Sequence, residues 1–113
     1  MTAAVILVST TLPDRELATG LAQALIRDRL AACVSIGAPV ESIYHWRGKV
    51  ETAKEVPVLI KTTGAQFAAV EAAIRRNHPY ELPEIVAVPI LDGYPPYLDW
   101  IAAETAPAAA PRA

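Results

Sequence analysis

The chain has 113 residues, enough for one domain with a single hydrophobic core. Ten basic and twelve acidic side chains give a formal charge of −2, which argues against the basic surface that nucleic-acid-binding proteins normally carry. The 53% apolar share excludes disorder for most of the chain, and the apolar runs are far shorter than the roughly 20 residues that a membrane span needs.

The chain begins with a predicted strand and helix. Residues 3–11 form a short, branched, apolar run, which is typical of a strand buried on both faces. Pro13 is tolerated at a helix start because its missing N–H would have no partner there, and Asp14 can cap the helix. Apolar residues then recur at helical spacing, so we expect a helix over about 14–29. Gly20 within it costs about 1 kcal/mol relative to alanine.

The next segment predicts a long hairpin. The first strand, residues 31–46, is interrupted by Gly37-Ala38-Pro39, which indicates a bulge or a bend. Arg47-Gly48 has glycine in second place, a hairpin signal, and leads into a return strand over 49–63. Because proline cannot donate to a ladder, we expect Pro57 at a non-bonding position or opposite a bulge.

The rest of the chain predicts a second helix–strand pair. Apolar residues at helical spacing from Phe67 predict a helix that ends before Pro79. Residues 84–91 predict a fourth strand, and Pro89 indicates that it lies at a sheet edge. The remaining expectations are a turn over 92–96, a short helix over 97–104, one domain over 1–105 and a disordered Ala/Pro tail over 106–113.

The predicted element order is β-α-β-β-α-β followed by a short helix. This order is that of the α+β ferredoxin-like fold, in which an antiparallel sheet carries its helices on one face. The chain offers only one short extra helix to cover the other face. Together with the high apolar share, this arrangement favours oligomerisation through the open face or through the long hairpin.

The candidate metal ligands are few. The single cysteine, Cys33, excludes an intramolecular disulfide and favours a reducing, cytoplasmic location. It is either a small buried hydrophobe or a soft ligand for Cu(I) or Zn, which needs a second ligand beside it. His78 either interacts with a helix end or contacts a metal or an anion. Glu81 and Glu84 are solvated or join it at a divalent-ion site. His45, near the hairpin tip, is expected to be an ordinary surface or interface residue.

Aromatic residues gather in the hairpin, in the loop after the second helix and near the C-terminus. They are Tyr44, Trp46, Tyr80, Tyr94, Tyr97 and Trp100. Their clustering indicates either packing between subunits or a stacking pocket for a small planar ligand. Lys61, at the end of the third strand, is either solvated or contacts an anion in a cleft. No nucleophile motif, Gly-rich phosphate loop or metalloprotease motif occurs, so we expect no enzymatic activity.

Several short blocks stand in order along residues 3–104. They are Thr10-Thr11 before Pro13-Asp14, Leu30-Ala31-Ala32-Cys33, Tyr44-His45-Trp46-Arg47-Gly48-Lys49, Glu51, Glu55, Leu59-Ile60-Lys61-Thr62, His78-Pro79-Tyr80, Leu82-Pro83-Glu84-Ile85 and Tyr97-Leu98-Asp99-Trp100. In this order the blocks closely resemble the CutA family, the divalent-cation tolerance proteins. His45 departs from that pattern, because an aromatic such as Tyr or Trp is common in the family at this position.

The resemblance implies a ferredoxin-like subunit in a tight homotrimer, with strands pairing across subunits and with lateral clefts like those of PII-type signalling proteins. It also implies tolerance of divalent metals, copper especially, without an obligate cofactor or an established enzymatic activity. Cys33 and His78 match family residues that are the candidate metal ligands. A second hypothesis is a PII-like module that binds a small anion or metabolite through Lys61, Tyr80 and Glu84. A third is a trimeric scaffold for a partner protein; no nucleic-acid or membrane partner is expected.

Overall fold

The computed structural model describes residues 4–105 and shows an α+β fold with an antiparallel sheet. Its elements are β1 (Val5–Leu12), α1 (Arg15–Arg27), β2 (Cys33–Ile36), β3 (Val40–Trp46), β4 (Lys49–Thr63), a 3₁₀ turn (Gly64–Gln66), α2 (Phe67–Asn77), β5 (Val86–Pro89) and α3 (Pro95–Glu104). The strand order is β2-β4-β1-β5, with β3 paired to β4 beyond the end of β2. The predicted ferredoxin-like order is therefore confirmed; the tail expected over 106–113 lies outside the described residues.

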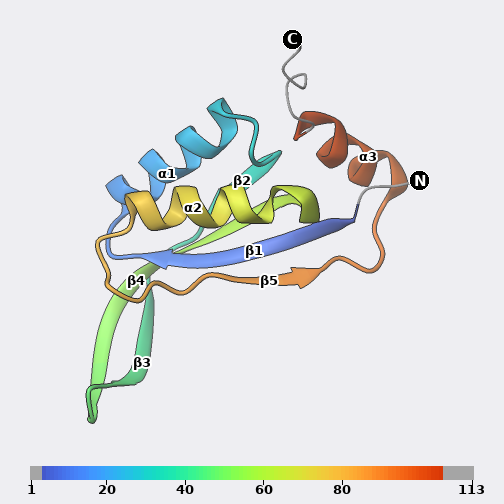
Figure 1. The fold of residues 1–113 in the computed structure, drawn as a ribbon. Helices are drawn as coiled ribbons and strands as arrows, with labels where there is room; N and C mark the ends of the chain where they lie inside the picture. Colours follow the sequence, from blue (N-terminus) through green and yellow to red (C-terminus); the bar gives the residue numbers. More distant parts are fainter. Residues whose placement is uncertain (1–3, 106–113) are drawn as a thin grey trace.

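The helices α1 and α2 lie side by side on one face of the sheet (Figure 1). Asp14 caps α1 as predicted, because its Oδ1 accepts a hydrogen bond from the Leu17 N–H at 2.8 Å. Apolar side chains from both helices and from the facing side of the sheet form the core. Its fully buried members include Val8, Leu12, Leu21, Leu25, Val58, Ile60, Val70 and Ile74.

The opposite face of the sheet is uncovered over much of its area. Leu59 pairs across the sheet with Ser9, which pairs in turn with Val86, so these three side chains share the face turned away from the helices. Leu59 and Val86 are 42% and 51% exposed. The prediction that β1 is buried on both faces is met only in part: on the face away from the two long helices Val5 is buried, but Leu7, Ser9 and Thr11 are half-buried.

The long second strand is divided into β2 and β3, and Gly37 lies in the gap between them. The Gly37 N–H donates to the Pro57 carbonyl at 2.9 Å, so Pro57 presents its bonding edge to this gap. A strand residue directs its N and its C=O to the same neighbour, and Pro57 therefore faces the interruption in the β2–β3 path. The interruption at Gly37 therefore accounts both for the expected bend and for the expected special position of Pro57.

The β3–β4 hairpin extends beyond the two-helix layer (Figure 1). Arg47 and Gly48 have φ angles of 53° and 81° at its tip, the left-handed conformations of the two central residues of a type I′ turn. Glycine adopts this conformation without a Cβ penalty, which explains why the sequence signal was informative here. The exposed hairpin carries Ile43 and Val50, which are 67% and 66% exposed.

The end of the described chain packs across the sheet as a short helix. The helix α3 begins at Pro95, two residues before the predicted start, because prolines in a first turn lack N–H groups that would be unpaired there anyway. It contacts β4 and β1, and Ile101 is its buried anchor. Pro89 lies in β5, the outermost strand, as predicted. Within residues 4–105, none of the helices has both the length and the apolar character required to cross a bilayer.

Candidate functional site

A pocket of about 620 Å³ lies where three segments meet: the β3–β4 hairpin, the end of β1 and the loop between α2 and β5. The pocket brings together two of the cleft residues expected from the sequence, Tyr80 and Glu84. Its lining consists of Thr11, Ser42, Tyr44, His45, Trp46, Glu55, Pro79, Tyr80, Glu81, Leu82 and Glu84. Lys61, the third predicted cleft residue, does not line it.

His78 holds the α2–β5 loop against β1. Its Nε2 lies 2.6 Å from the Thr11 carbonyl, and its Nδ1 accepts a hydrogen bond from the Tyr80 N–H at 3.1 Å. A carbonyl can only accept and a backbone N–H can only donate, so these partners select the neutral tautomer with the proton on Nε2. The buried His78 ring also packs against the Tyr80 ring, with 4.7 Å between the centroids. His78 thus positions one wall of the pocket.

The position of His78 follows from the sheet. The strand β5 pairs with β1 only over Ile6–Ser9, so the bonding edge of β1 continues beyond the end of its partner. His78 supplies the donor for the Thr11 carbonyl in that continuation. Nearby, the Ser9 hydroxyl lies 3.4 Å from Glu84 Oε2. Two contacts with β1 therefore hold the loop that carries Tyr80, Glu81 and Glu84.

Glu55 is the buried carboxylate of the pocket, with 7% of the residue exposed. It is the last β4 residue paired to β3, just before β4 changes partners to β1 and β2. Burial and then the neighbouring Glu55 carboxylate raise the pKa of the Tyr80 hydroxyl above its ordinary value of 10.0, and Tyr44 adds a smaller contribution. In the sequence Glu55 stands out only as part of the CutA-like blocks, because no local pattern indicates that a distant loop lies beside it.

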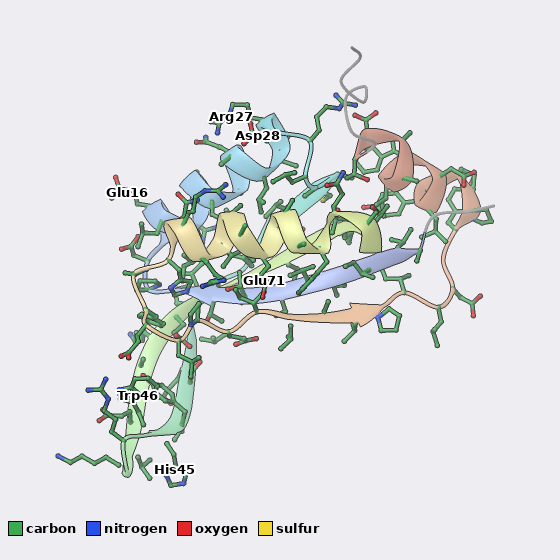
Figure 2. The ribbon with its side chains drawn as sticks, viewed as in Figure 1. Glu16, Arg27, Asp28, His45, Trp46 and Glu71 are labelled. Carbon is green, nitrogen blue, oxygen red and sulfur yellow. The ribbon has the colours of Figure 1, made fainter. Side chains whose placement is uncertain are left out.

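The charge of the lining is acidic. Glu55, Glu81 and Glu84 line the pocket, and neither lysine nor arginine does. At the rim, Arg47 Nη2 lies 2.8 Å from Glu81 Oε1, and the guanidinium carbon lies 5.3 Å from the centroid of the Trp46 ring. Figure 2 shows Trp46 and His45 on the hairpin. His45 is exposed, as expected of a surface residue, and its side chain also lines the pocket.

Cys33 lies elsewhere, at the start of β2 on the uncovered face of the sheet. It pairs with Lys61 of β4, and Lys61 pairs with Leu7 of β1. The Lys61 ammonium lies 5.8 Å from the centroid of the Tyr97 ring, which stacks on Trp100 at 5.5 Å. Lys61 and these C-terminal aromatics therefore belong to the uncovered face.

One chain does not bring Cys33 and His78 together. Cys33 lies in the row of Leu7, whereas His78 contacts Thr11, four residues and about 13 Å further along β1. Two ligands of one ion must lie within about 4–5 Å of each other. Among residues 4–105, no group of three His, Cys, Asp or Glu side chains has the proximity to hold a metal ion. Residues 4–105 of one chain therefore do not bring Cys33 and His78 into one metal site.

The fold and the pocket define the class of the protein: a ferredoxin-like α+β domain with an uncovered sheet face and an acidic, aromatic lateral pocket. A family model described as CutA1 divalent ion tolerance protein matches residues 6–104. The chain therefore belongs to the CutA1 divalent ion tolerance family.

Individual relatives agree with this assignment. The divalent-cation tolerance protein CutA of Thermus thermophilus is 44% identical over 95 residues, which cover 84% of this chain and 92% of that protein. Protein CutA of Mus musculus is 42% identical over 91 residues, covering 80% of this chain but only 51% of the mouse protein. The crystal structure of CutA1 from Oryza sativa superposes with a TM-score of 0.90 at 39% identity, covering 93% of this chain and 96% of that chain.

Tyr80 is expected to make the free energy of unfolding depend on pH in the alkaline range. Its raised pKa means that the folded chain holds the phenolic proton more tightly than the unfolded chain does. This stabilisation is complete below the unfolded pKa of about 10 and is lost as the pH rises through the folded pKa. The free energy of unfolding should therefore fall more steeply above pH 10 in the wild type than in Tyr80→Phe, as measured by denaturant titration. The exposed Tyr94→Phe serves as the control with a wild-type slope, and equal slopes for Tyr80→Phe and wild type would contradict the argument.

Proposed function

We propose that this protein acts in the response of the cell to divalent cations, that it does so by binding and not by catalysis, and that its working form is a homotrimer. Membership of the CutA1 divalent ion tolerance family carries the first part of the proposal. We place the protein in the cytoplasm, which agrees with its single cysteine. Relatives differ in this respect, since one from Arabidopsis thaliana is named chloroplastic and one from Archaeoglobus fulgidus is titled periplasmic.

The uncovered sheet face supports the trimer. Apolar side chains stand half-exposed on this face, Leu59 in the inner strand β4 and Val86 and Val88 in the edge strand β5, and a single short helix covers only part of the surface. Exposed apolar patches of this kind in small domains are commonly buried against other subunits. The hairpin, with Ile43 and Val50 exposed, offers a second surface for the same purpose.

Cys33 supports a copper site that more than one subunit completes. A thiolate is a soft ligand that selects Cu(I), and Cys33 lies on the face that the trimer would use. His78 would have to release the Tyr80 N–H to bind a metal through Nδ1, so the copper proposal rests first on Cys33. When bound, copper would add a soft Lewis-acid centre at the subunit boundary.

One experiment tests assembly and copper together. Light scattering on dilute protein should give a mass near three chains for the wild type and for Cys33→Ala. Titration with Cu(I) should show binding to the wild type and a loss of at least tenfold in affinity for Cys33→Ala. His45→Ala, which removes an imidazole from the hairpin, should bind copper as the wild type does. A monomeric mass would contradict the trimer, and unchanged copper affinity in Cys33→Ala would remove Cys33 from the site.

The pocket supports a second candidate function, a PII-like module that binds a small ligand beside the hairpin. The specific observation is the convergence of Tyr80, Glu84 and the buried Glu55 in one pocket of about 620 Å³. This volume falls within the range of about 300–1,000 Å³ that small-ligand sites occupy. The acidic lining favours a cationic ligand over the anion considered from the sequence.

A further inference from the structure

The pocket contains the carboxylate of a largely buried residue, Glu55, which has no cationic partner in the described part of the chain. Only 7% of the surface of Glu55 is exposed, and none of the ion pairs within residues 4–105 includes it. Removing a carboxylate from water is costly unless a cation or several hydrogen-bond donors replace the lost hydration. The neighbouring Tyr80 hydroxyl, whose pKa the Glu55 carboxylate raises, is neutral and supplies no positive charge.

The rest of the lining has the chemistry of a cation site. Two further carboxylates, Glu81 and Glu84, and the rings of Tyr44, Trp46 and Tyr80 line the same pocket. The electron-rich face of an aromatic ring attracts a cation, and the attraction grows when the cation is partly desolvated. The pocket therefore offers both opposite charge and ring faces to a positively charged group.

The chain itself shows this mode of recognition at the rim. The Arg47 guanidinium pairs with Glu81 at 2.8 Å and lies over the Trp46 ring at 5.3 Å. A carboxylate and an aromatic ring of the lining thus already hold one nitrogen cation. The Glu55 carboxylate, which lines the same pocket, has no such partner within residues 4–105.

We infer that the pocket binds a cationic nitrogen group, an ammonium or a guanidinium, which pairs with Glu55 and packs against Tyr44 and Tyr80. This inference rests on the ligand-binding role proposed above for the same pocket. A bare divalent metal fits less well, because the acids of the described residues do not form a group of three that could hold an ion. The cation has two potential sources with the same chemistry: a free small amine or guanidine, and a lysine or arginine side chain of a second copy of the chain.

The test compares ligands of similar size and different charge. Wild-type protein is titrated with n-butylammonium, n-butylguanidinium, n-butanol and butyrate, and binding is followed by calorimetry and by chemical-shift changes. We expect both cations to bind, and butanol and butyrate to bind at least tenfold more weakly. Glu55→Gln, which keeps the shape but removes the charge, should weaken cation binding at least tenfold. Glu16→Gln on α1, outside the pocket lining, should leave it unchanged (Figure 2).

A second variant guards against misfolding of Glu55→Gln. Tyr44 is 40% exposed, so Tyr44→Leu should fold normally while removing a ring face, and it should also weaken cation binding severalfold. Circular dichroism verifies the fold of each variant. A folded Tyr44→Leu that binds cations as tightly as the wild type would exclude the aromatic contribution.

The two sources give different results. If the natural occupant is a free cation, the added cations should bind to the assembled wild type in a Glu55-dependent way. If the occupant is a side chain of a second copy, the added cations should not bind, and Glu55→Gln should lower the mass of the assembly measured by light scattering. Equal binding of butanol and butylguanidinium, or neither effect, would overturn the inference. Glu55-dependent binding of butyrate alone would leave the pocket as a ligand site and reject only the cationic class.

Discussion

Replacing His78 by alanine is expected to lower the free energy of unfolding by about 2–4 kcal/mol. The ring bridges two segments that are far apart in the sequence, the end of β1 at Thr11 and the loop at Tyr80. Each lost hydrogen bond costs about 1 kcal/mol, and the groups left unpaired around a partly buried cavity add to that cost. Denaturant unfolding at fixed protein concentration measures the difference, because dissociation of an oligomer would make stability depend on concentration.

The chain contains one other histidine, which provides a matched control. His45 is exposed on β3 and has no side-chain hydrogen bond within residues 4–105, so His45→Ala should change stability by less than about 0.5 kcal/mol. His78→Gln keeps a donor and an acceptor and should recover part of the loss. Equal effects of the two alanine substitutions would show that the bridge from Thr11 to Tyr80 contributes little.

Gly37→Ala and Gly20→Ala are expected to change stability in opposite directions, although the chemical change is the same. At Gly37 a Cβ atom would lie 3.0 Å from Cγ of the Pro57 ring, and a proline ring cannot rotate away. The Gly37 N–H bond to the Pro57 carbonyl also holds the two backbones together, so we expect a loss of about 1–3 kcal/mol.

Gly20 lies within the exposed surface of α1, and no atom lies within 4 Å of the Cβ that alanine would add. Alanine there should stabilise the protein by about 0.5–1 kcal/mol, because it reduces the conformational freedom of the unfolded chain and favours the helix. Denaturant unfolding of both variants under the same conditions tests the pair. A stabilised or neutral Gly37→Ala would contradict the close approach between Gly37 and Pro57.

Local sequence signals predicted most of the fold. The apolar periods indicated the order of strands and helices, Asp14 indicated the start of α1, and Arg47-Gly48 indicated the hairpin turn. These signals work because capping, turn conformation and amphipathic spacing depend on neighbours in the sequence. The division of the second strand at Gly37 was also predicted from a local signal, since glycine and proline change the conformation and hydrogen bonding of the backbone where they stand.

The candidate site was predicted only in part. Tyr80 and Glu84 were chosen as cleft residues, and the structure does place them in one pocket. Lys61 was chosen with them but lies on the uncovered sheet face, because its place in β4 alternates with that of the buried Ile60. The residues that match family metal ligands, Cys33 and His78, are separated by the register of the sheet.

The sequence by itself determined the element order and the apolar surplus that appears on the uncovered sheet face, because each depends on composition or on spacing along the chain. Only the tertiary structure decided that the α2–β5 loop closes over Glu55 and that His78 fastens this loop to β1. The physical reason is that a pocket is a relation between segments distant in sequence. Strand register and loop closure, which no local pattern encodes, set the distances within it.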